Sequence, residues 1–191
     1  MDGAELPLNV AVTAQKVAAE LEARGYDYAL GGAIALGFWA NPRGTLDVDF
    51  TIFIPVERAS ECVRLLQQIG CQFSASKALT MLREHGLCHV ELDKVPLDVF
   101  LPGIDFYDAA RPRRRKMLLG SREVMAWDAE PLIVFKMMFF RPQDLVDIAA
   151  ILSQQGPALD RAWVRDQLVE IFGQRDLRIA RWDELAGEHP I

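Results

Sequence analysis

The 191-residue sequence has few cysteines, few histidines and no long apolar run. Cys62, Cys71 and Cys88 are widely spaced and odd in number, so we expect no disulfide framework. No stretch reaches the roughly 18 apolar residues that a membrane-spanning helix needs. Residues 1–5 are acidic and lack the basic and then apolar layout of a secretion signal. These absences favour a reducing, cytoplasmic location.

The composition is that of a globular protein rather than a disordered chain. Hydrophobic residues make up 51% of the sequence and charged residues 25%. The net charge of −6 argues against a protein that coats nucleic acids, although it does not exclude a local basic site. The length suits one good core, or one domain with a helical appendage.

Residues 46–52 carry the most informative pattern in the chain. Every second residue is apolar, which predicts a β-strand with one face in the core; these residues are Leu46, Val48, Phe50 and Ile52. Asp47 and Asp49 lie on the opposite face, about 6.5–7 Å apart at Cα. Two such carboxylates repel each other unless a cation lies between them, and a pair of Mg²⁺ ions about 3.5–4 Å apart would suit them. The alternative is an ordinary solvated strand face.

A double glycine precedes this strand. Residues 28–30 predict a short buried strand, Gly31 and Gly32 follow it, and residues 33–39 predict an apolar helix. Such a turn places free backbone N–H groups at the start of a helix, and glycine lets a phosphate approach them closely. A tight turn without a ligand is the alternative.

Together the two motifs resemble the nucleotidyltransferase fold of the DNA polymerase β superfamily. The signature of that superfamily is a hydrophobic residue, Gly-Gly or Gly-Ser, a short helix, and then Asp-hydrophobic-Asp. In this chain the matching residues are Leu30-Gly31-Gly32 and Asp47-Val48-Asp49. The resemblance implies an α/β (α+β) fold, with a small mixed sheet flanked by helices, and a third carboxylate on a strand after a hairpin. Asp98, inside the apolar run 97–101, fits that position; a hydrogen-bonded edge aspartate is the other interpretation.

The rest of the chain predicts alternating helices and strands and then an all-helical tail. Helices are expected over 9–24, 56–69, 130–140, from 141–148 onward, 160–172 and 175–186. Strands are expected over 81–83, 87–92, 96–101 and 122–127, with a turn at 84–86. We therefore divide the chain into an α/β nucleotidyltransferase-like domain, residues 1–127, and a C-terminal helical region packed on it, residues 128–191.

Lys136 lies in the middle of a helix that is apolar on every side. A buried ammonium group requires a carboxylate or phosphate partner. The partner is either Asp144 or Asp147, in a structural ion pair, or a bound triphosphate. We favour the triphosphate.

Two other groups of residues are less specific. The run Arg111–Lys116 packs five cations into six positions, and is either a solvated face or a contact for nucleotide or RNA phosphates. His85, Cys88 and His89 lie close together in the sequence but match no standard closed zinc site.

Further motifs resemble the nucleotidyltransferase-like proteins of the abortive-infection toxin group. They are the run Arg43-Gly44-Thr45-Leu46-Asp47-Val48-Asp49, and Lys136 followed by Arg141-x-x-Asp144-x-x-Asp147. The resemblance covers residues 26–155. The chain departs from the pattern of this group at Gln143, where the group often has lysine. The resemblance therefore implies no second phosphate contact at Gln143.

The resemblance implies a metal-dependent transfer of an NMP group from an NTP to an acceptor hydroxyl on RNA, a protein or a small molecule. It assigns Mg²⁺ or Mn²⁺ as the cofactor, and Asp47, Asp49 and Asp98 as both metal ligands and catalytic residues. The nucleotide-binding residues that it implies are Gly31, Gly32, Arg43, Thr45 and Lys136. A toxin role with an antitoxin partner is one expectation within it. The rival is a non-catalytic member of the same fold that binds a nucleotide or a protein partner.

Overall fold

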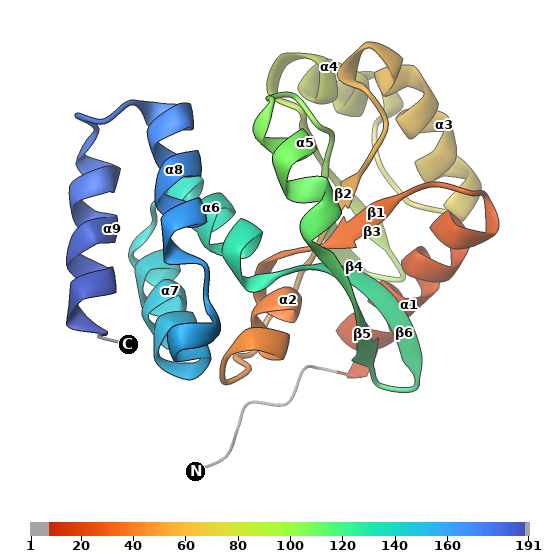
Figure 1. Ribbon diagram of the computed structural model, residues 1–191. Helices are drawn as coiled ribbons and strands as arrows, with labels where there is room; N and C mark the ends of the chain where they lie inside the picture. Colours follow the sequence, from red (N-terminus) through yellow and green to blue (C-terminus); the bar gives the residue numbers. More distant parts are fainter. Residues whose placement is uncertain (1–7, 190–191) are drawn as a thin grey trace.

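The computed structural model describes residues 8–189, which form a mixed sheet covered by helices (Figure 1). The strands are β1 (Tyr28–Leu30), β2 (Val48–Ile52), β3 (Leu87–Leu92), β4 (Val95–Phe100), β5 (Arg114–Leu119) and β6 (Arg122–Trp127). Their order across the sheet is β3-β4-β2-β1-β6-β5. β2 runs parallel to β4 and β1 runs parallel to β6, whereas the other neighbours are antiparallel. The end of β1, which leads into the glycines, therefore lies beside the start of β2, which carries Asp49.

Helices pack on both faces of this sheet. They are α1 (Leu8–Ala23), α2 (Gly32–Trp39), α3 (Ala59–Ile69), α4 (Ala75–His85), α5 (Phe106–Ala110), α6 (Ala129–Phe139), α7 (Pro142–Gln155), α8 (Arg161–Phe172) and α9 (Leu177–Glu188). Short 3₁₀ turns cover Val56–Arg58, Arg111–Arg113 and Gly156–Ala158. None of the described helices is long and apolar enough to span a membrane.

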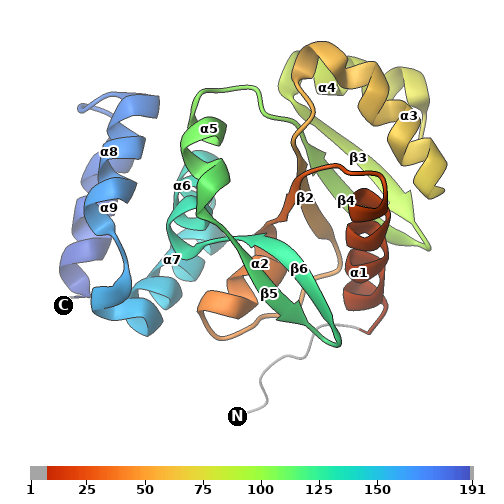
Figure 2. The same ribbon diagram turned by 45° about the vertical axis from the view of Figure 1, so that its right-hand side comes forward.

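Successive residues of the strands point to opposite faces of the sheet and so belong to two different hydrophobic cores. Val48, Phe50 and Ile52 of β2 point into the first core, which joins the sheet to α1, α3 and α4. Ala29 of β1 and Trp127 of β6 point into the second core, which is built with α2 and α5 to α9. Figure 2 shows the first group of helices on one side of the sheet and α5 to α9 on the other, with α8 and α9 outermost. Asp49, between two core-facing residues, is thereby directed to the second side.

Most of the predicted elements are confirmed, and so is the fold class. The strand over 28–30, the helix after the double glycine, the hairpin of β3 and β4, and the strand over 122–127 are present. Helices also occupy the predicted stretches near 9–24, 56–69 and 130–186. The division into residues 1–127 and 128–191 stays a prediction. The second core draws on both parts, because it contains α2 and α5 as well as α6 to α9.

Two predictions about local structure are wrong, and one strand was not predicted. The strand over 81–83 and its turn are part of α4, because Ala78 and Leu82 bury one side of a helix that ends at Gly86. Leu46 is not a core residue: its side chain is 77% exposed and β2 begins only at Val48. The predictions also omitted β5, which pairs with β6 along its whole length.

The basic run Arg111–Lys116 is balanced by acidic side chains from elsewhere in the fold. Arg111 and Arg114 pair with Asp27, Arg113 with Asp160, Arg115 with Asp128, and Lys116 lies 3.9 Å from Glu123. The hydrogen bond from Arg111 lowers the pKa of the Asp27 carboxyl. The run therefore consists largely of surface ion pairs at the start of β5.

Candidate active site

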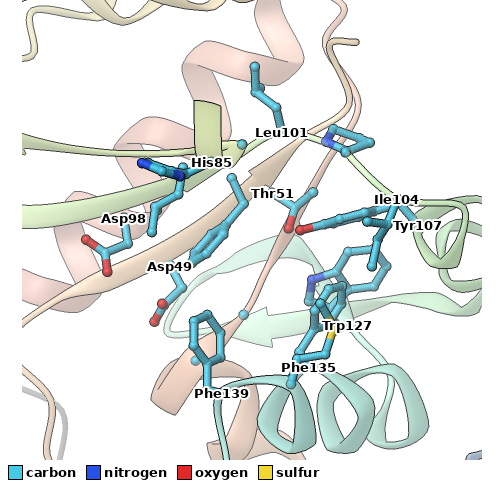
Figure 3. Close-up of a pocket in the computed structure, with 18 of the residues that line it drawn as sticks. Asp49, Thr51, His85, Asp98, Leu101, Ile104, Tyr107, Trp127, Phe135 and Phe139 are labelled. Carbon is cyan, nitrogen blue, oxygen red and sulfur yellow. The ribbon is translucent and has the colours of Figure 1, made fainter. Parts of the chain in front are cut away.

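A cavity of about 1280 Å³ opens beside the sheet, with walls from β2, β4, α5 and α6 (Figure 3). Two parts of its lining differ in character. We call the first the carboxylate end; it is formed by Gly31, Gly32, Asp47, Asp49 and Asp98. We call the second the aromatic end; it is formed by Thr51, Phe53, Tyr107, Trp127 and Phe135.

The three predicted carboxylates come together at the carboxylate end. Asp49 and Asp98 are paired in register on the parallel strands β2 and β4, which lie about 4.8 Å apart. Asp47 immediately precedes β2. Burial, and then the charges of Asp47 and Asp98, raise the pKa of the half-buried Asp49 to about 7. The nearby cations Lys136 and Arg141 act in the opposite direction without offsetting this rise.

Gly32 is required by the position of Asp49. The Gly31 N–H donates to the Asp49 carbonyl oxygen over 2.9 Å, which holds the turn against β2. Gly32 has a φ of +53°, in the left-handed region. A Cβ atom at residue 32 would lie only 1.7 Å from Asp49 Oδ2. The double glycine thus makes room for a carboxylate, in addition to exposing backbone N–H groups at the start of α2.

Two of the carboxylates are engaged with neighbouring side chains. The Thr45 hydroxyl donates to Asp47 Oδ1, and His89 Nδ1 lies 2.6 Å from Asp98 Oδ1. Within residues 8–189, no three His, Cys, Asp or Glu side chains are already grouped so as to hold a metal ion. The donor set nevertheless suits Mg²⁺, which binds through one or two carboxylates and completes its octahedron with water and phosphate oxygens. The residues therefore fit a metal that binds together with a nucleotide.

Lys136 is buried at the wall of the cavity and forms an ion pair. Its Nζ atom lies 2.6 Å from Asp147 Oδ2 and 3.8 Å from Asp144 Oδ1. Burial would raise the pKa of Asp147, but hydrogen bonds from Arg43, Lys136 and Gln143 together lower it. The structural ion pair that the sequence offered as an alternative is thus present. A contact between Lys136 and a triphosphate stays a prediction.

Several cavity residues escaped the sequence analysis. Thr51 was recoverable, because alternation along β2 puts it on the same face as Asp49. His89 was considered in the sequence only as part of a zinc group, and its position opposite Asp98 follows from the hairpin register. The side chains of the aromatic end come from β2, α5, β6 and α6, so no local sequence pattern connects them.

No protein-family model matches the chain, and no curated protein sequence matches it. Solved structures do match. The solution structure of the antibiotic-resistance factor ANT(2'')-Ia has a TM-score of 0.57 at 15% identity, over 94% of this chain and 96% of that chain. ANT(2'')-Ia in complex with adenylyl-2''-tobramycin has a TM-score of 0.56 at 14% identity, over 91% and 97%. The lincosamide antibiotic adenylyltransferase LnuA, bound to lincomycin, has a TM-score of 0.53 at 12% identity, over 78% and 98%. The chain has the nucleotidyltransferase fold.

The nucleotidyltransferase fold confirms the broader of the two resemblances seen in the sequence. At these identities the likeness extends to the fold alone. The narrower resemblance, to the abortive-infection toxin group, stays a prediction.

We expect Asp49→Asn to stabilise the metal-free protein in a pH-dependent way. The folded-state pKa of about 7 lies above the ordinary value of 3.8, so the stability linked to Asp49 is complete below pH 4 and is lost as the pH rises through 7. At 1.36 kcal/mol per pKa unit the loss is on the order of 4 kcal/mol. Urea denaturation of both proteins from pH 4 to 8 should give a difference in unfolding free energy that grows with pH. A difference independent of pH would contradict the assignment.

We expect Gly32→Ala to be more destabilising than Gly25→Ala. Both glycines have positive φ, +53° and +74°, but a Cβ atom at Gly25 would meet nothing within 4 Å. Gly25→Ala should therefore cost only the left-handed strain of about 1–2 kcal/mol, whereas Gly32→Ala also displaces Asp49. In an Asp49→Ala background the additional cost should largely disappear. Equal costs for the two glycines would mean that residue 32 has more room than the structure indicates.

We expect Lys136→Met to cost about 3–5 kcal/mol of unfolding free energy, because it leaves two buried carboxylates without their ammonium partner. Lys116→Met is the matched control, since the Lys116 side chain is 71% exposed and should cost less than about 1 kcal/mol. Chemical denaturation measures both. If Lys136→Met leaves stability unchanged and only weakens NTP binding, the ion pair with Asp147 is not structural.

Proposed function

We propose that this protein transfers a nucleotidyl group from an NTP to a hydroxyl group of an acceptor, with Mg²⁺ or Mn²⁺ held by Asp47, Asp49 and Asp98. The observation that carries the proposal is the convergence of these carboxylates with Gly31 and Gly32 in one cavity. At about 1280 Å³ the cavity exceeds the 300–1,000 Å³ typical of a single small-molecule site, so it has room for a nucleotide and part of an acceptor.

The polar groups around the carboxylate end suit a triphosphate. Gly31 and Gly32 open the backbone at the start of α2, where the helix dipole favours negative charge. A cluster of charges lies next to them, with three cations facing two carboxylates: Arg43, Lys136 and Arg141 against Asp144 and Asp147. These cations would attract the phosphates, while a bound metal would offset the charges of Asp47, Asp49 and Asp98. Thr45 orients Asp47 through its hydroxyl hydrogen bond.

In the proposed reaction the acceptor oxygen forms a bond to the α-phosphorus while the bond from that phosphorus to pyrophosphate breaks. The metal, when bound, would stabilise the charge that spreads over the phosphate oxygens. Asp98 would share a metal or take the proton of the acceptor hydroxyl, and its hydrogen bond with His89 would fix its orientation. Asp49, whose pKa is raised by burial and by the two neighbouring carboxylates, would be stabilised in its ionised form by a bound cation.

A small molecule is the acceptor that the comparisons support best. The ANT(2'')-Ia complex contains an adenylylated tobramycin and the LnuA structure contains lincomycin. We therefore rank a small hydroxylated compound above RNA or a protein. The toxin role, the antitoxin partner and a cytoplasmic location stay predictions from the sequence.

The proposal is tested by pyrophosphate release. The purified protein is incubated with Mg²⁺ and each NTP, alone and with tobramycin, lincomycin, total RNA or a protein mixture. We expect acceptor-dependent release that chelation of the metal abolishes, and a loss of about 100-fold or more in Asp49→Asn. Asp93→Asn, in the exposed turn between β3 and β4, is the matched control and should keep full activity.

Nucleotide binding without release under all these conditions would favour the non-catalytic alternative. Absence of nucleotide binding would contradict nucleotidyl transfer and leave only a member of the fold that binds a protein partner.

A further inference from the structure

Three polar groups at the aromatic end lack a partner. Thr51, Tyr107 and Trp127 are 4%, 7% and 2% exposed, and all three line the cavity. In the part of the chain that the structure describes, the Thr51 hydroxyl, the Tyr107 hydroxyl and the Trp127 indole N–H form no hydrogen bond to the protein, and none of the three atoms is fully buried, so each is open to the cavity. Polar atoms that open onto an otherwise aromatic cavity can form hydrogen bonds to a ligand bound there. Figure 3 shows the Thr51 and Tyr107 hydroxyls directed toward the same space, beside the Trp127 ring.

Aromatic rings surround these polar groups. The ring centroids of Tyr107 and Phe135 are 5.2 Å apart, and those of Trp127 and Phe135 are 5.1 Å apart. Phe53 meets Trp127 edge-on at 5.8 Å. Such walls stack against flat rings, while the two hydroxyls both donate and accept hydrogen bonds and the indole donates only. This combination suits a flat, uncharged ring with nitrogen and oxygen atoms on its edge.

The distance between the aromatic end and the carboxylates matches the distance between the base and the α-phosphate of an NTP. Thr51 and Asp49 share a face of β2, so their Cα atoms are about 6.5–7 Å apart. A ribose spans this interval between an α-phosphate held near Asp49 and a base held near Thr51. In contrast, the other side of the cavity is open: the side chains of His85 and His89, near Asp98, are 67% and 58% exposed. An acceptor of any size has access there.

We propose that the aromatic end binds the nucleobase of the donor NTP, with Thr51, Tyr107 and Trp127 hydrogen-bonding to its edge. This inference rests on the proposed function, because it takes the carboxylate end as the phosphate site. The aromatic end would also accept a ring of the acceptor, and the experiment distinguishes a bound nucleobase from a bound acceptor ring.

The test compares NTPs with tripolyphosphate, which has the phosphates but no base. Affinities of ATP, GTP, CTP, UTP and tripolyphosphate are measured by calorimetry with Mg²⁺ for the wild type, Thr51→Val and Tyr107→Phe. Each variant removes one hydroxyl and keeps the side-chain shape, so the melting temperature should be unchanged or higher. We expect each to weaken binding of the preferred NTP about 5- to 10-fold, as for one lost hydrogen bond, and to leave tripolyphosphate binding unchanged.

The matched controls are Thr13→Val and Tyr26→Phe, which remove hydroxyls outside the cavity and should bind NTPs as the wild type does. If the wild type binds NTPs no better than tripolyphosphate, or if the two cavity variants bind NTPs normally, the inference is overturned while nucleotidyl transfer stands. If the two cavity variants bind NTPs normally but have a raised KM for the acceptor, the aromatic end binds the acceptor instead. A wild type that binds neither NTP nor tripolyphosphate would overturn the proposed function as well.

Discussion

The burial of Asp49 beside two further carboxylates is the constraint on which the site depends. Asp49 lies beside Asp98 on the neighbouring strand and close to Asp47, and its burial, together with these two charges, raises its pKa to about 7. The same carboxylate occupies the space where residue 32 would carry a Cβ atom, so that residue is glycine. The glycine turn into α2 and the position of Asp49 therefore depend on each other. A bound cation would reduce the electrostatic repulsion among the three aspartates.

A second cluster of charges joins the helical tail to this site. Asp147 on α7 accepts hydrogen bonds from Lys136 on α6 and from Arg43 in the loop before β2, while Arg141 pairs with Asp144. Residues 104 positions apart in the chain are thereby held together. The tail therefore forms a wall of the cavity, because α6 supplies both the buried Lys136 ammonium group near the carboxylate end and the Phe135 ring of the aromatic end. Changes in the tail should consequently affect ligand binding as well as stability.

The parts of the fold that the sequence predicted well are those with a strong local pattern. Alternation around Asp49 located β2 and the direction of its carboxylate, and the apolar character around Lys136 located α6. α4 was missed because only Ala78 and Leu82 are fully buried on it, too few to reveal a helical period. β5 was missed because its cations Arg114 and Arg115 are balanced by Asp27 and Asp128, which come from other elements. The aromatic end depends wholly on tertiary packing and had no local signal.

The most direct measurement is a crystal structure of the protein with Mn²⁺ and a non-hydrolysable NTP analogue, with manganese located by its anomalous scattering. The account predicts manganese bound among Asp47, Asp49 and Asp98, with the phosphates against Gly31 and Gly32. A nucleotide bound elsewhere, or bound at the glycines without manganese on these carboxylates, would contradict it.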